Sequence, residues 1–110
     1  MDSVEPLQIA RGGSRARFEG WVELWIGGSR RRAAARDLSA EGMGLSLSGP
    51  LPPRQSAVTS EFALPGIILP LALEGIVVWT NPVASRIGIR FLEVDPGLAE
   101  LLDSYVAGRL

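Results

Sequence analysis

Hydrophobic and polar residues alternate over most of the chain, which is the pattern of β-strands with one buried face. In the segment 21–26, WVELWI, every second residue from Val22 is aliphatic, whereas the residues between them are Trp or Glu. Gly27-Gly28 follows directly and favours a hairpin turn, because both residues accept positive φ. The pattern therefore predicts a β-hairpin whose second strand covers about 30–36.

The same alternation predicts four further strands, separated by segments rich in Gly and Pro. They cover about 43–47, 56–63, 68–80 and 86–91, with connections at 49–54 (GPLPPR), Pro65-Gly66 and Asn81-Pro82. The segment 68–80 is apolar on both faces, as expected of a central strand, and Pro70 confines its regular pairing to the part that follows.

The hydrophobic period changes to that of an α-helix after Asp95. Asp95 is suited to the N-cap, Pro96 to the first helical position and Gly108 to the end. An amphipathic helix is therefore predicted over about 96–107. Its apolar stripe consists of Leu98, Leu101, Leu102, Tyr105 and Val106.

Six antiparallel strands and one C-terminal helix predict an all-β fold, a small closed or nearly closed barrel capped by the helix. The helix stripe must cover an apolar surface, and Trp21 and Trp25, which point outward from the first strand, are candidates for it. Residues 1–17 have no periodicity and include Gly12-Gly13, so they are expected to form a mobile arm. Residues 18–110 are expected to form the barrel and helix.

Composition narrows the possible chemistry. The 110 residues suit one domain with one core, and the chain has neither Cys nor His. Disulfides are thereby excluded, and the usual transition-metal ligands and the commonest general base are missing. We expect no catalysis, no metal and no cofactor. The N-terminus lacks the apolar run of a signal peptide, and the most apolar stretch is too short and interrupted for membrane insertion, so a cytoplasmic protein is expected.

Charge is unevenly distributed although the net charge is only −1. All eleven basic residues are Arg. Seven of them and four acids precede residue 37, whereas four of them and eight acids lie from residue 37 onward. The N-terminal third therefore carries +3 and the remainder −4. This asymmetry favours a local anion site over a general basic surface, and we expect no binding of DNA or RNA.

Two short motifs carry the candidate chemistry. Arg11 and Arg15 form R-x-x-x-R, and Asp37, Ser39 and Gly42 form D-x-S-x-x-G before the third strand. Taken alone, the arginines could be solubilising charges, and the aspartate and serine could simply cap a turn. The glycine could equally mark a β-bulge.

Together these motifs resemble the PilZ domain family, bacterial modules that bind the second messenger cyclic di-GMP. The resemblance extends from residue 11 to 107 and includes LPP at 51–53, GIVVW at 75–79, GIRF at 88–91 and the closing helix. It implies a nucleotide-sensing module that folds its arginine arm over cyclic di-GMP and signals to a protein partner. The alternative is a PilZ-like interaction adaptor with weak or no nucleotide binding. A barrel that binds single-stranded nucleic acid ranks last, because the chain has few aromatic residues for stacking.

The resemblance also implies roles for the motif residues. Arg11 and Arg15 would contact guanine and phosphate groups, for which the guanidinium fork is suited. Asp37 would accept hydrogen bonds from guanine N1–H and the exocyclic amine. Ser39 would add a short donor and acceptor, and Gly42 would let the backbone approach the ligand.

Four further residues are weaker candidates for ligand contact: Arg17, Arg36, Trp79 and Arg90. RAAAR also gives Arg32 and Arg36 the R-x-x-x-R spacing, directly before the aspartate motif. In the family a complete strand separates the arginine pair from that motif. We therefore interpret these two as solvated strand charges or secondary ligand contacts.

Overall fold

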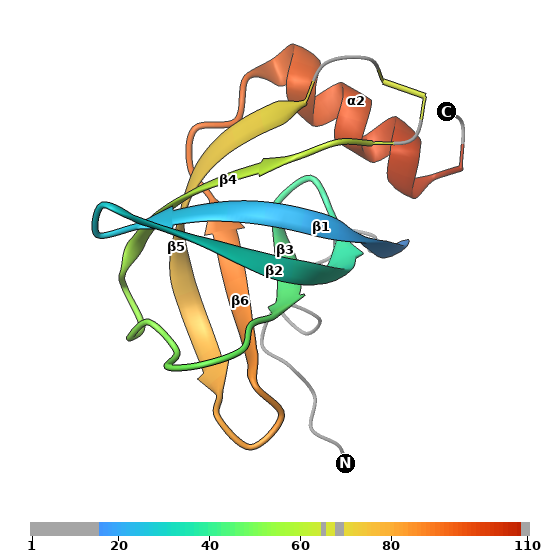
Figure 1. Ribbon diagram of the computed structural model, residues 1–110. Coiled ribbons are helices and arrows are strands. Elements are labelled where there is room, and N and C mark those ends of the chain that lie inside the picture. The colour runs from blue at the N-terminus through green and yellow to red at the C-terminus, as the bar shows by residue number, and fades with distance from the viewer. Residues whose placement is uncertain (1–15, 65, 68–69, 109–110) are drawn as a thin grey trace.

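The computed structural model describes residues 16–64, 66–67 and 70–108. Within these ranges six strands and one helix are formed: β1 (Ala16–Ile26), β2 (Ser29–Leu38), β3 (Gly42–Ser46), β4 (Ala57–Phe62), β5 (Leu71–Asn81), β6 (Arg86–Phe91) and α2 (Pro96–Val106). All strand pairs are antiparallel, in the order β1-β2-β3-β6-β5-β4, and pairing of β4 with β1 closes the barrel (Figure 1). The predicted fold class is confirmed.

The β1–β2 hairpin forms where the sequence predicts it. Gly27 and Gly28 have φ values of 58° and 83°, the positive values required by the tight turns that match the twist of a hairpin. The second strand, however, continues to Leu38, two residues beyond its predicted end. Asp37 therefore lies within β2 and not in the turn after it. Of the expected N-terminal arm, only Ala16 and Arg17 are described, and both belong to β1.

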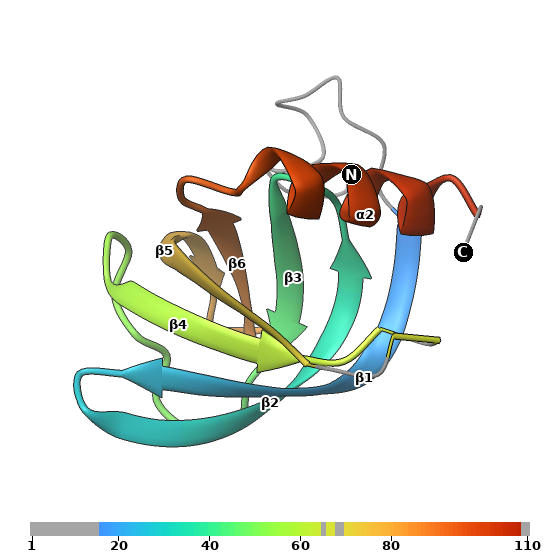
Figure 2. The same cartoon turned by 90° about the horizontal axis from the view of Figure 1, so that it is seen from above.

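The hydrophobic core fills the barrel, and α2 covers one end of it (Figure 2). Leu102 of α2 is fully buried, and the ring of Tyr105 meets the ring of Phe18 edge-on, with centroids 5.8 Å apart. Phe18 in turn contacts Phe62 of β4 with centroids 5.9 Å apart. The helix thus packs beside the start of β1, which in turn contacts the end of β4. No helix among the described residues is long and apolar enough to cross a membrane.

The helix begins as predicted but covers a different surface. Asp95 accepts a hydrogen bond from the backbone N–H of Leu98 at 3.2 Å, and Pro96 occupies the first turn. Trp21 and Trp25 are 62% and 37% exposed, so the prediction of these two as candidates for the covered surface is wrong. The stripe packs on the barrel end instead, where Leu98, Leu101, Leu102 and Tyr105 join the hydrophobic core.

Two irregularities in strand pairing meet at Arg36. Register shifts occur between Arg17 and Gly20 in β1 and between Ala35 and Asp37 in β2. Arg36 is the extra residue of β2 relative to β3, as in a β-bulge. Before it, alternate residues of β2 point inward up to Ala35; after it, Leu38 is the next buried residue. Arg36 and Asp37 consequently both stay on the outer side of the barrel.

Candidate functional site

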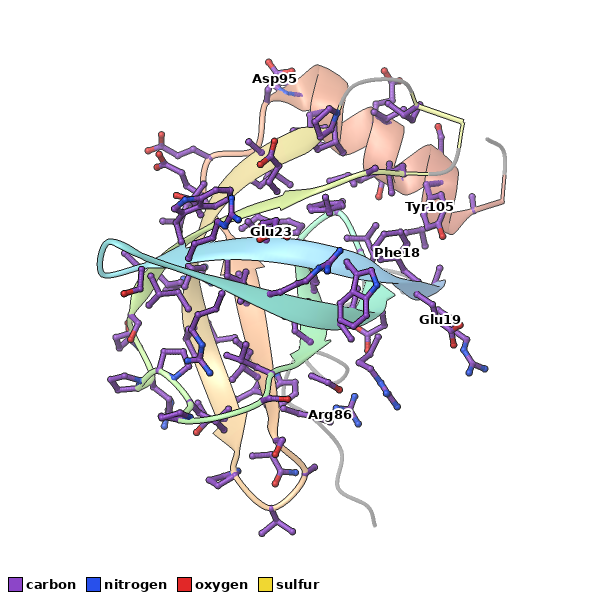
Figure 3. All side chains as sticks on the ribbon, viewed as in Figure 1. Phe18, Glu19, Glu23, Arg86, Asp95 and Tyr105 are labelled. Carbon is purple, nitrogen blue, oxygen red and sulfur yellow. The ribbon has the colours of Figure 1, made fainter. Side chains whose placement is uncertain are left out.

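A surface hollow of about 460 Å³ lies on the outside of the barrel, over the irregular part of β1 and β2. It is lined by Arg17, Glu19, Gly20 and Trp21 of β1, by Ala34, Ala35, Arg36 and Asp37 of β2, and by Arg86 of β6. Figure 3 shows Glu19 and Arg86 on the same side of the molecule. The hollow therefore collects side chains from strands that lie far apart in the sequence.

Asp37 is held in the wall of this hollow by the adjacent strand. Its Oδ1 accepts a hydrogen bond from the backbone N–H of Gly44 at 3.1 Å. A Cβ on Gly44 would come within 3.1 Å of the same carboxylate, so the glycine gives the aspartate room against β3. The side chain is half-buried, and its position is fixed by the sheet.

Ser39 and Gly42 form the turn between β2 and β3. The Ser39 hydroxyl accepts hydrogen bonds from the backbone N–H groups of Glu41 at 3.1 Å and Gly42 at 3.2 Å. Ser39 is only 3% exposed. A Cβ on Gly42 would overlap the carbonyl oxygen of Ile89, so the close approach that this glycine permits is to strand β6. Both residues follow Asp37 within five positions in the sequence, but neither of them lines the hollow.

A row of directly opposed residues crosses five strands on the outer face. Arg17 is paired with Asp37, Asp37 with Gly44, Gly44 with Gly88, and Gly88 with Trp79. Opposed residues in neighbouring strands project from the same face of a sheet. The two glycines thus form a strip without side chains of its own, which the Asp37 carboxylate covers at Gly44 and the Trp79 indole covers at Gly88.

Trp79 closes the far end of that strip. It is 6% exposed but does not belong to the core cluster, in agreement with its outward position. A Cβ on Gly88 would overlap the indole nitrogen, so the ring lies directly over the glycine. The buried Nε1–H has no hydrogen-bond partner among the described residues. A buried donor of this kind is costly unless something accepts from it.

The hollow is rich in guanidinium groups. Arg17, Arg36 and Arg86 line it together with two carboxylates, Glu19 and Asp37. Glu19 Oε2 lies 2.9 Å from Nη2 of Arg17, in an ion pair that is largely solvent-exposed. Such an exposed pair contributes little to stability, so Arg17 can exchange its partner at small cost.

The structure places the four weaker candidates for ligand contact in different surroundings. Arg17 and Arg36 line the hollow with Asp37, and Trp79 lies at the end of the adjoining strip. Arg90 is exposed beside a separate hollow of about 440 Å³, over the β2–β3 turn and the start of the segment before α2. Arg11 and Arg15 lie outside the described residues.

Arg86 and Trp21 were not predicted as site residues. The alternation in β6 indicates that Arg86 points outward, but its approach to Asp37 depends on β6 lying beside β3. Trp21 similarly meets the site only because β1 pairs with β2, where it lies opposite Ala34. Among the described residues, no group of three or more acidic side chains is placed to hold a metal ion.

The architecture is a small antiparallel barrel with a C-terminal helix over one end and a polar hollow on its first two strands. The sequence matches the family model of the PilZ domain over residues 10–108. The chain belongs to the PilZ domain family.

Solved structures share this fold at low sequence identity. The Bacillus subtilis inhibitor of motility (MotI/DgrA) aligns with a TM-score of 0.74 and 18% identity over 90% of this chain and 50% of its own. The PilZ domain of YcgR from Escherichia coli, solved with c-di-GMP, aligns with a TM-score of 0.70 and 18% identity over 90% of both chains. PlzA from Borreliella burgdorferi, solved in complex with c-di-GMP, aligns with a TM-score of 0.68 and 16% identity over 90% of this chain.

The chain spans half of the Bacillus protein and 42% of the Borreliella protein, so these two contain further parts that it does not match. No curated protein matches the sequence closely enough to count as a relative.

Proposed function

We propose that this chain binds cyclic di-GMP in the hollow of β1, β2 and β6, and that Arg11 and Arg15 close over the bound nucleotide. The observation that carries the proposal is the meeting of the motif residue Asp37 with Arg17, Arg36 and Arg86 in one hollow. The family membership and the two neighbours solved with c-di-GMP support the choice of ligand.

The chemistry of the hollow suits both parts of the ligand. A guanine presents O6 and N7 as acceptors, which a guanidinium can bind with two parallel hydrogen bonds. Its N1–H and exocyclic amine are donors, for which the Asp37 carboxylate is the matching acceptor. The two phosphates carry negative charge, which the arginines of the hollow and of the arm neutralise through charge-assisted hydrogen bonds.

The other motif residues contribute through the backbone. Ser39 and Gly42 shape the turn that ends β2 and starts β3, and this turn holds Asp37 at its place in the pair with Gly44. Trp79 does not line the hollow and its Nε1–H is buried over Gly88, so its contribution is to cover this glycine beside the site. Arg90, over a different hollow, is left with a solvated role.

The proposal includes no catalytic step. Nucleotide binding would change the surface formed by the arm and the hollow, and a protein partner that recognises this surface would receive the signal. The chain then acts as a sensor and its partner as the effector.

Isothermal titration calorimetry with cyclic di-GMP tests the proposal, with GTP and cyclic GMP as controls. We expect saturable binding of cyclic di-GMP and much weaker binding of the two controls, because neither offers two guanines and two bridging phosphates together. Binding of all three with equal affinity would indicate a general anion site. Absence of binding by the folded chain would favour the interaction adaptor and overturn the proposal.

A further inference from the structure

We infer that Trp21 is a base-stacking residue of this site: its indole forms the wall against which one guanine of the bound nucleotide stacks. The inference rests on the proposed function and adds to it a residue outside the R-x-x-x-R and D-x-S-x-x-G motifs. It follows from the exposure of Trp21, its place in the hollow and the ion pairs that hold it.

Small residues separate Trp21 from Arg86 across the outer face of the sheet. Trp21 is paired with Ala34, Ala34 with Ser46, and Ser46 with Arg86. Neighbouring strands are about 4.8 Å apart, so about 14 Å separates the backbones of Trp21 and Arg86. The two residues between them are small. These small side chains leave room for a planar base beside the indole, over Ala34, which lines the hollow.

Arg32, itself paired with Glu23, contacts the indole of Trp21. The guanidinium carbon of Arg32 lies 4.8 Å from the centroid of the Trp21 ring, within the range of a cation–π interaction. Nε of Arg32 lies 3.6 Å from Oε2 of Glu23, and Nε of Arg30 lies 3.6 Å from the other carboxylate oxygen. Glu23 of β1, labelled in Figure 3, is paired with Arg32 across the hairpin and forms ion pairs with both arginines.

The cation–π contact favours one orientation of the ring. Arg32 covers part of the indole, yet the side chain remains 62% exposed and lines the hollow that contains Asp37. A tryptophan has few rotatable bonds, so fixing it costs little conformational entropy on binding. Stacking of a base on an aromatic ring is favourable for any purine, and Asp37 and the arginines then select guanine by its edge.

Trp25 provides a matched control. It lies four residues along the same strand, on the same outer face, and is also partly exposed at 37%. It is paired with Arg30 and Thr59 and does not line the hollow. A loss of affinity that arose from general damage to the outer face of β1 would follow from substitution of either tryptophan.

The experiment titrates cyclic di-GMP into wild type, Trp21→Phe, Trp21→Leu, Trp21→Ala and Trp25→Leu, each with a thermal melt. We expect Trp21→Phe to bind within about threefold of wild type, because it keeps an aromatic face. Trp21→Leu and Trp21→Ala should bind about tenfold more weakly or worse. Trp25→Leu should bind as wild type does. Melting temperatures should differ little, since the side chain lies outside the core.

The comparison of phenylalanine with leucine carries the test, because both are apolar and only one can stack. Equal affinity of Trp21→Leu and Trp21→Phe would overturn the stacking role, as would unchanged affinity of Trp21→Ala. An equal loss in Trp25→Leu would assign the effect to the sheet face and likewise overturn it. Failure of the wild-type chain to bind would instead refute the proposed function, which keeps the two failures apart.

Discussion

Replacing Asp37 separates its structural contribution from its proposed contact with the ligand. In Asp37→Ala, the backbone N–H of Gly44 loses the acceptor that lies 3.1 Å away. Gly44 is buried, so solvent replaces this hydrogen bond only in part, and we expect the free energy of unfolding to fall by about 1–2 kcal/mol. For a domain of this size that is a decrease in Tm of about 5–10 °C.

The effect on binding should be larger than the effect on stability. Without the carboxylate, the guanine N1–H and amine are desolvated with no acceptor, which we expect to weaken cyclic di-GMP binding by about 2 kcal/mol, or roughly thirtyfold. Asp37→Asn keeps one carbonyl oxygen for the Gly44 N–H. It should therefore lower the Tm only slightly and weaken binding to an intermediate degree.

Asp95 gives a control of the same chemistry away from the hollow. It also accepts one backbone N–H, from Leu98 at 3.2 Å, as the N-cap of α2. Asp95→Ala should cost about 1 kcal/mol of stability and leave affinity unchanged. Urea unfolding and calorimetric titration of the three variants make the comparison. If Asp37→Ala lost stability but bound as tightly as Asp95→Ala, Asp37 would be a structural residue only.

Three further predictions concern the arm, the turn and the β3–β4 loop. Arg11→Ala and Arg15→Ala should each weaken cyclic di-GMP binding by about 2 kcal/mol at unchanged Tm, with Arg32→Ala weakening it less in the same titrations. A reversal of that order would assign the motif to the second arginine pair. Gly42→Ala should lower the free energy of unfolding in urea by about 2–3 kcal/mol, because its methyl group would overlap a backbone oxygen that cannot rotate away; an unchanged midpoint would contradict this. Arg31→Ala removes hydrogen bonds to the carbonyl oxygens of residues 48 and 50, so amide exchange in that loop should accelerate while exchange in the barrel core stays constant.

The fold was predictable because its signals are local. Alternation, the Gly27-Gly28 turn and the Asp95 cap each depend on residues within a few positions of one another, and all three are present in the structure. The predicted end of β2 was wrong, also for a local reason. Arg36 and Asp37 are consecutive polar residues, which interrupt alternation and therefore look like the start of a turn.

The site was predictable only in part, because its assembly depends on pairing between distant segments. The order β3-β6 brings Arg86 to Asp37 from about fifty positions along the chain, and the β1–β2 register brings Trp21 to the same hollow. No spacing within the sequence encodes either approach. The surface that the helix covers was likewise not predictable, because amphipathicity identifies the apolar stripe of a helix but not the surface that the stripe meets.

The extra residue at Arg36 also affects how sequences of this kind can be compared and altered. If β2 were regular and kept Arg36, strict alternation would place Asp37 on the face of Ala33 and Ala35, inside the barrel. Deletion of Arg36 would instead remove the bulge and keep Asp37 outward, but it would take one arginine out of the hollow. An alignment of the motif letters alone does not reveal whether the strand carries the bulge. Transfer of the site to another barrel consequently requires this bulge as well as the side chains.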